Sequence, residues 1–155
     1  MSEITFSVFG IPKPAGSKTA FAIKRGGVYT GRTVVMDACK KTKSWQAIVK
    51  AEAKKHAPAT PFVGPIKVAF NFYLPRPKSH HGTGKNSKFV KVSAPDWHIG
   101  RPDLLKLARA VEDAMTGMIY ADDAQIVIET LEKSYSETLS NCGVYIKIES
   151  RFEKK

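Results

Sequence analysis

Acidic residues stand on both sides of one short apolar segment of the chain. Asp103 comes directly before the segment 104–115, and Asp122 and Asp123 follow it. Magnesium prefers oxygen ligands and is held in proteins by a few carboxylates together with water and substrate phosphate. A metal ion held in this way activates water for phosphodiester hydrolysis. The three Asp residues are therefore candidate ligands for Mg²⁺, with Mn²⁺ as a substitute, if the fold brings the two ends of the segment together. The other interpretation, equally favoured by the spacing, makes Asp103 a helix N-cap and the Asp pair a turn.

The charge of the chain is unevenly distributed along its length. The net charge is +11; residues 1–95 hold 17 Lys and Arg against 3 acidic residues, whereas residues 96–155 hold 8 against 11. A basic surface attracts polyanions, because each neutralised phosphate releases condensed counterions. Nucleic acid is therefore the leading partner, and an acidic cluster in a basic chain is typical of a metal-dependent nuclease. A charge that serves solubility alone is the alternative interpretation.

Basic residues in three stretches are candidate DNA contacts. They flank a first hairpin, populate a long loop and surround Asp103, and they are Lys18, Lys24, Arg25, Arg32, Lys78, Lys85, Lys88, Lys91, His98, Arg101 and Lys106. The alternative is that they form only a solvated face. Trp97 is the aromatic residue that we expect to touch DNA or a partner subunit, whereas Trp45 and Phe70 have periodic apolar neighbours and are expected in the core.

Hydrophobic periodicity predicts an α+β fold around these residues. The expected order is βββαβαββ, a two-layer sandwich with a mixed or antiparallel sheet and two main helices on one face. A hairpin is expected at Gly26 and Gly27, and a Pro-, Gly-, Ser- and Lys-rich loop at about 75–101 is expected to be functional or mobile. The expected strands are 4–10, 65–74, 124–135 and 142–152, and the expected helices are 41–56 and 104–115.

Length and composition suit one globular domain that spans residues 1–155. No apolar run is long enough for a membrane helix and the first residues lack signal-peptide features, so we expect a cytoplasmic protein. Cys39 and Cys142 are far apart and have no metal-binding spacing. Neither a disulfide framework nor a structural zinc site is therefore indicated.

The stretch HIGRPDLLKLARAVEDAMTGMIYADDAQIV at 98–127 resembles the core of the RusA family of Holliday junction resolvases. That core has a proline-aspartate entry, a helix ending in D-A-L/M-x-G, and then D-D-x-Q-I/V-V. The segments 16–21 and 41–49 resemble the phage-encoded branch of the family. The resemblance implies a magnesium-dependent endonuclease that cuts branched DNA in recombination and repair. It also implies a homodimer, because symmetric nicking needs two active sites.

The resemblance implies roles for individual residues. The first catalytic Asp of the family falls on Asp103 and the later one on Asp123, with Asp122 beside it. The helix Lys of the family, which acts on the phosphate, falls on Arg109. Arg keeps the charge but suits clamping a phosphate better than transferring a proton. Alternatively, Arg109 forms an i,i+4 pair with Asp113 on the helix surface. His98 also matches a position just before the entry.

One position departs from the family pattern. The family has a second catalytic Asp two residues after the first, and this chain has Leu105 there. Glu112 lies on nearly the same helix face, but about 10 Å further along the axis, which is far for direct replacement. Two hypotheses follow: a nuclease with a differently built metal site, and a branched-DNA-binding protein without catalysis. An RNA-binding module is a weaker third, because no RRM, KH or zinc-knuckle pattern is present.

Overall fold

The computed structural model describes residues 2–16, 18–37 and 41–151, with the backbone alone for residues 18, 19 and 35–37. Cys39 lies outside the described residues. The strands are β1 (Glu3–Phe9), β2 (Lys18–Arg25), β3 (Val28–Asp37), β4 (Ile66–Leu74), β5 (Ile126–Tyr135) and β6 (Gly143–Ser150). The α-helices are α1 (Thr42–His56) and α2 (Leu104–Met115), and short 3₁₀ turns lie at Lys78–His80, Gly84–Asn86, Asp123–Gln125 and Leu139–Asn141. The predicted order βββαβαββ is confirmed.

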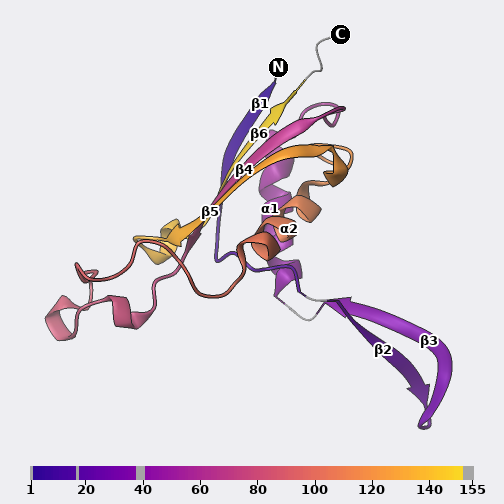
Figure 1. Cartoon of the computed structure of the whole chain (residues 1–155), viewed down its shortest axis with the longest axis horizontal. Helices are drawn as coiled ribbons and strands as arrows, with labels where there is room; N and C mark the ends of the chain where they lie inside the picture. Colours follow the sequence, from indigo (N-terminus) through magenta and orange to yellow (C-terminus); the bar gives the residue numbers. More distant parts are fainter. Residues whose placement is uncertain (1, 17, 38–40, 152–155) are drawn as a thin grey trace.

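Four strands form a mixed sheet in the order β1-β6-β4-β5, with both helices on one face (Figure 1). β6 runs antiparallel to β1 and to β4, whereas β4 and β5 are parallel. Alternate residues of β4 are fully buried toward the helices, among them Val68, Phe70 and Phe72. This alternation is what a sheet covered on one face requires. The predicted α+β architecture is therefore confirmed.

The helices bury apolar stripes at helical spacing, as their sequences predict. Trp45 and Val49 of α1 are buried, as are Leu107 and Val111 of α2. The side-chain amide of Gln46 donates a hydrogen bond to the backbone carbonyl of Ala110, 3.1 Å away, and joins the two helices. The opposite faces of α1 and α2 remain accessible, and this leaves polar side chains of both helices available beside the core.

Two segments project from the body formed by the sheet and the helices (Figure 1). The hairpin β2–β3 is a separate two-stranded sheet that turns at Gly26 and Gly27, where both φ angles are positive as a tight hairpin turn requires. The loop 75–101 projects on the other side. The described part of the chain contains no helix that is both long enough and apolar enough to cross a membrane.

The loop 75–101 is anchored to the end of β5 by the ring of Tyr135. The rings of His80 and His98 contact this ring at centroid distances of 4.8 and 4.7 Å, and the guanidinium of Arg76 lies 5.1 Å from its centroid. Arg76 also donates a 2.7 Å hydrogen bond to the carbonyl of Pro95. These contacts hold the two ends of the loop 75–101 together. The loop is therefore attached to the fold despite its length.

Candidate active site

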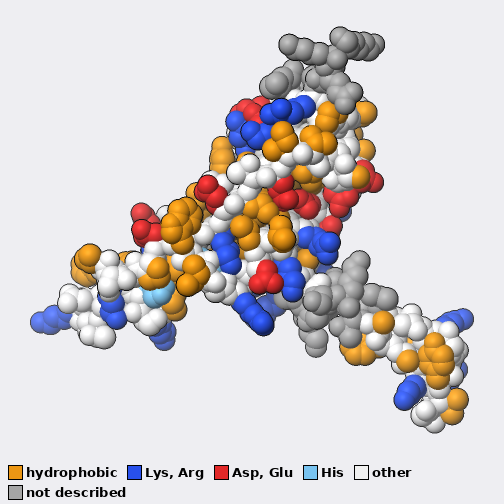
Figure 2. Space-filling view, in the orientation of Figure 1, with side chains coloured by type: hydrophobic (Ala, Val, Ile, Leu, Met, Phe, Trp, Pro, Cys, Tyr) orange, Lys and Arg blue, Asp and Glu red, His pale blue; other side chains and the backbone are white. Residues whose placement is uncertain are grey.

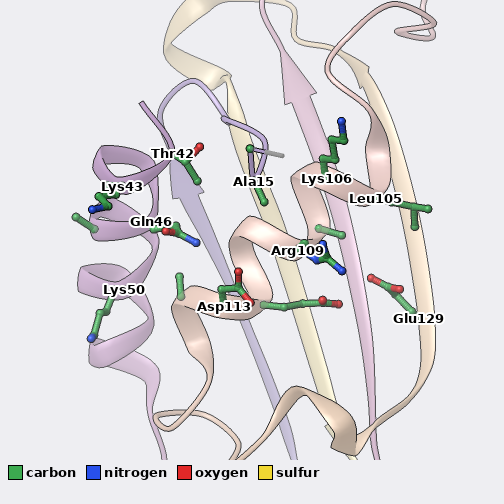
Figure 3. A pocket seen from close by; sticks show the side chains of 15 residues that line it. Ala15, Thr42, Lys43, Gln46, Lys50, Leu105, Lys106, Arg109, Asp113 and Glu129 are labelled. Carbon is green, nitrogen blue, oxygen red and sulfur yellow. The ribbon is translucent and has the colours of Figure 1, made fainter. Parts of the chain in front are cut away.

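An open cavity of about 1140 Å³ lies between α1 and α2 and reaches β5 (Figure 3). Its lining combines basic residues of both helices with acidic residues of α2 and β5. The lining residues on which the site depends are Lys43, Gln46, Lys50, Leu105, Lys106, Arg109, Glu112, Asp113 and Glu129.

Two carboxyl groups meet in this cavity, Glu112 from α2 and Glu129 from β5; we call them the acidic pair. Burial raises the pKa of Glu112 most, and a hydrogen bond to Glu129 and the negative charges of Glu129, Asp123 and Asp113 raise it in the same direction; together they bring it to about 8. Two carboxylates this close cannot both be ionised without strong repulsion. At neutral pH Glu112 is therefore protonated and donates to Glu129.

The backbone of Glu112 is held firmly at the end of α2. Its carbonyl accepts hydrogen bonds from the Thr116 amide, the Thr116 hydroxyl and the Tyr120 hydroxyl, each 3.0 Å long. Tyr120 is fully buried, and burial together with the charge of Glu112 raises its pKa, so the phenol stays a neutral donor. The acidic side chain thus projects from a rigid base.

Cations line the rest of the cavity. Lys43 and Lys50 come from α1, and Lys106 and Arg109 come from α2. Figure 3 shows that Arg109 and Glu129 project into the same space between α2 and β5. Within the described residues, Lys43, Lys50 and Arg109 form no ion pair. Unpaired cations beside an acidic pair suit an anionic ligand such as a phosphodiester.

The sequence-predicted Asp residues lie at opposite ends of α2. Asp103 is the N-cap residue by position, but its side chain makes no capping hydrogen bond; it is 63% exposed and lies 3.6 Å from the ammonium of Lys106. At 1.5 Å per residue, Asp103 is about 13 Å from Glu112 along the axis. Asp123 is close enough for its charge to raise the pKa of Glu112. The structure thus brings Asp123, but not Asp103, toward the acidic pair.

Asp122 uses its side chain in the turn before β5. The carboxylate accepts a 2.8 Å hydrogen bond from the amide of Ala124, and the amide of Asp122 donates to the side-chain oxygen of Gln125 at 2.9 Å. This reciprocal capping box gives Asp122 the turn role that was one of the two interpretations of its sequence. Figure 2 shows acidic side chains over this part of the molecule, with basic side chains beside them.

The donor set at the acidic pair fits a divalent cation completed by substrate. In the part of the chain that the structure describes, no group of three or more His, Cys, Asp or Glu side chains is arranged to hold a metal ion. Magnesium, however, is commonly held by one or two carboxylates plus water and substrate phosphates. A cation between Glu112 and Glu129 would also relieve the repulsion that now keeps a proton on the pair.

Lys133 of β5 supports the segment that leads to Asp103. Its ammonium donates 2.7 Å hydrogen bonds to the carbonyls of Gly100 and Pro102. His98 lies half-buried against Tyr135, and burial and then the charge of Lys133 lower its pKa. His98 is therefore packed into the anchor of the loop and carries little charge at neutral pH.

The predicted DNA contacts are distributed over the two projections and the start of α2. Lys24, Arg25 and Arg32 are exposed on the hairpin, and the side chain of Lys18 lies outside the described residues. Lys78, Lys85, Lys88 and Lys91 are exposed on the loop 75–101. Arg101 and Lys106 line a smaller cavity of about 400 Å³ together with Asp103. Trp97 is 62% exposed, whereas Trp45 and Phe70 are buried as predicted.

Sequence reasoning missed several residues of the cavity. Glu129 lies on an exposed part of β5, and only the register of the sheet brings it opposite α2. Lys43 and Lys50 stand seven residues apart on α1, a spacing that places both on one helix face and is the signal that could have found them. No short motif marks any of the three.

Comparison with known proteins gives two matches. The family described as "Endodeoxyribonuclease RusA" matches residues 13–149 of the chain. The "Uncharacterized protein YqaN" of Bacillus subtilis (strain 168) is 32% identical over 140 residues, which cover 88% of this chain and 91% of that protein. The residues that match the family include α2, the acidic pair and the basic residues that line the cavity.

Proposed function

Because the chain belongs to the RusA endodeoxyribonuclease family, we propose that it resolves Holliday junctions and other branched DNA by Mg²⁺-dependent phosphodiester hydrolysis. This activity would serve DNA recombination and repair. The observation that carries the proposal is the placement of the acidic pair at one end of a cavity whose walls hold unpaired cations. Carboxylates repel DNA unless a metal intervenes, so this combination suits a metal-dependent nuclease better than a simple anion-binding surface.

We propose Asp103, Asp122 and Asp123 as metal ligands, as the family resemblance implies, and we add the acidic pair to them. Glu112, Glu129 and Asp123 are supported as ligands because their carboxylates lie close together, and Asp103 is supported by an exposed carboxylate that is paired, within the described residues, only with Lys106 at the entry to α2. Magnesium bound at such carboxylates supplies a more acidic water and stabilises negative charge on the phosphate. The ligand shell would be completed by phosphate oxygens of the DNA.

The chain's own cations would bind and orient the DNA strand. Arg109 projects beside the acidic pair and can clamp a phosphate with two hydrogen bonds, in the role that the family gives to a Lys. Lys43 and Lys50 line the same cavity from α1 and would hold neighbouring phosphates. Each contact fixes the strand relative to the carboxylates, and this positioning is itself a large part of catalysis.

We further propose that the protein is a homodimer. Symmetric resolution nicks two opposed strands and therefore needs two active sites related by a two-fold axis. The proposal predicts a dimer at micromolar concentration in analytical ultracentrifugation. A monomer under these conditions, together with single unpaired nicks, would contradict paired resolution.

A second candidate function rests on Leu105. This side chain is 71% exposed at the position where the family has an Asp, so it contributes no ligand to the cavity that it lines. A protein that binds branched DNA without cutting it would tolerate this change. Magnesium would then alter its affinity little, and the carboxylates would be dispensable.

Cleavage of a labelled four-way junction beside a linear duplex of the same sequence separates the two functions. We expect paired, symmetric nicks on the junction in Mg²⁺, no cutting of the duplex and none with chelator. Tight junction binding without cleavage in Mg²⁺ or Mn²⁺ would instead establish the binding protein. Structured RNA as a competitor tests whether DNA is the preferred nucleic acid.

A further inference from the structure

The hairpin β2–β3 stands away from the body of the molecule. It pairs with no other strand in the described part of the chain, and every residue from 20 to 34 is exposed. Figure 1 shows it extending from the end of α1 as an arm. A lone two-stranded hairpin is only marginally stable in water, because neither of its faces is covered. A binding partner would cover the exposed faces of such an arm.

The surface of the arm combines apolar and basic side chains. Phe21, Val28 and Tyr29 are more than half exposed. Phe21 pairs with Val34, so two apolar side chains are neighbours across the strands. At the tip, Arg25 pairs with Val28, so a guanidinium lies beside an apolar side chain. Exposed side chains of this size and number on one small element are typical of a binding surface.

The charge of the arm favours a polyanionic partner. The residues 18–36 contain no Asp or Glu, and Lys24, Arg25 and Arg32 are exposed and form no ion pair within the described chain. Figure 2 shows blue and orange side chains but no red ones on the arm. A second copy carries the same net charge of +11 and is therefore a poorer match for this arm than nucleic acid.

The base of the arm is built into the cavity. Gly16, just before β2, and Thr42, at the start of α1 after β3, both line the cavity. The Thr42 hydroxyl donates a 2.6 Å hydrogen bond to the carbonyl of Pro14, and the amide of Ala15 donates to the carbonyl of Lys106 at 2.8 Å. The segments on both sides of the arm thus lie beside α2, in the cavity that contains the acidic pair.

We propose that the hairpin β2–β3 inserts as a two-stranded ribbon into the major groove of a duplex arm of the DNA substrate. The major groove is about 12 Å wide and admits a β-ribbon. At about 3.3 Å per residue, the ten residues of β3 span roughly 33 Å, about one turn of B-DNA. Lys24, Arg25 and Arg32 then contact phosphates and base edges. This inference rests on the proposed function for the identity of the substrate as DNA.

The test uses the full-length chain with three exposed cations neutralised, Lys24→Gln, Arg25→Gln and Arg32→Gln. The matched control, Lys54→Gln, Lys55→Gln and Arg151→Gln, removes the same charge from exposed residues at the far end of α1 and after β6. Duplex and junction binding are measured in chelator, so that no cleavage occurs. Circular dichroism verifies that both proteins keep the fold.

We expect the hairpin variant to bind duplex at least tenfold more weakly than the control. The slope of log affinity against log salt should become shallower by about 2.7, at about 0.9 for each lost phosphate contact. Wild-type protein, but not the hairpin variant, should protect guanine N7 in the major groove from dimethyl sulfate. Equal loss in the hairpin variant and the control, or unchanged N7 reactivity with wild-type protein, would overturn the proposal.

Three further outcomes separate this proposal from its alternatives. If the hairpin variant sediments as a monomer while wild-type protein and control are dimers without DNA, the arm binds a second copy and the groove proposal is wrong. If wild-type protein cuts junctions and the hairpin variant binds them as tightly as wild type, the inference fails and the proposed function stands. If wild-type protein protects N7 through the arm but cuts no junction, the inference stands and the proposed function fails.

Discussion

The two ends of α2 present carboxylates in opposite settings. At the start of the helix, Asp103 is exposed, faces the ammonium of Lys106 and lies at the positive end of the helix dipole. Near the other end, Glu112 is half-buried, faces Glu129 and has its pKa raised to about 8. The first carboxylate has a cation beside it, whereas the second has another carboxylate beside it. A metal ion would therefore relieve more repulsion at the acidic pair than at Asp103.

The same strand creates both settings. β5 contributes Glu129 opposite Glu112, and four residues later it contributes Lys133, which donates to the carbonyls of Gly100 and Pro102 just before Asp103. One strand thus adds negative charge at one end of the helix and positive charge at the other. The substitutions below each change the charge or the contacts at one of these two ends of α2.

The largest effect is expected from Asp123→Asn. Asp123 adds negative charge beside the acidic pair, so its loss should lower junction cleavage by more than about 100-fold, a larger loss than changes to residues that only hydrogen-bond a metal ligand usually cause. Junction binding should persist or tighten, because a repulsive charge is gone. Cleavage assays and gel-shift titrations measure the two effects, and retained cleavage would show that the site lies elsewhere.

Asp122→Asn is the matched control for that change. Its side chain already accepts a hydrogen bond inside the capping box, and Asn can accept the same bond. We expect a smaller loss of cleavage than for Asp123→Asn. An equal or greater loss would show that Asp122 contributes to the metal site at least as much as Asp123 does.

Lys133→Met should loosen the other end of α2. The change removes two hydrogen bonds from a charged donor to the segment before Asp103, at a cost of about 2 kcal/mol in the free energy of unfolding. Urea denaturation measures this loss. Lys147→Met, whose partners Glu3 and Glu149 are on the sheet surface, serves as the control and should cost less than about 1 kcal/mol. Equal losses would contradict a special role for Lys133.

The acidic pair also predicts how stability depends on pH in chelator. The pKa of Glu112 is about 8 in the folded protein and 4.5 as its ordinary value, so the folded state binds this proton more tightly. Its contribution to the free energy of unfolding is complete below pH 4.5 and is lost as the pH rises toward 8. Glu112→Gln should remove this contribution and unfold at a higher temperature than wild type at pH 8.

Differential scanning calorimetry between pH 5 and 8.5 measures this difference. Asp103→Asn is the comparison variant, since its exposed carboxylate lies at the opposite end of the helix. Its unfolding temperature should follow that of wild type across this range. A wild-type profile that does not fall toward pH 8 relative to Glu112→Gln would contradict the shared proton.

The smallest effect is expected from Leu105→Asp. This exposed position lines the cavity one turn before Arg109, so the substitution adds a carboxylate without disturbing the core. The Mg²⁺ concentration that gives half-maximal cleavage should fall by a few-fold, because one more oxygen ligand is available. Leu105→Asn controls for polarity without charge. A lower cleavage rate with the Asp variant would mean that Leu105 contacts the DNA.

Local signals predicted most of the fold but only part of the site. The bounds of α2 agree with the prediction because an apolar stripe begins after Pro102-Asp103 and stops at Thr116-Gly117. The hairpin followed from Gly26-Gly27. The acidic pair was beyond sequence reasoning, because Glu112 and Glu129 are brought together by the parallel pairing of β4 and β5. Long-range register of this kind leaves no short motif, and Lys133 was missed for the same reason.

Junction cleavage by Glu112→Gln, measured beside Glu132→Gln, tests directly whether the acidic pair holds the metal. Both changes remove one carboxylate, but Glu132 is an exposed residue of β5 that does not line the cavity. Each protein is titrated with Mg²⁺ on a labelled four-way junction. The account predicts that Glu132→Gln cuts like wild type and that Glu112→Gln cuts more than about 100-fold more slowly at every Mg²⁺ concentration. Wild-type cleavage by Glu112→Gln would show that the acidic pair does not hold the metal.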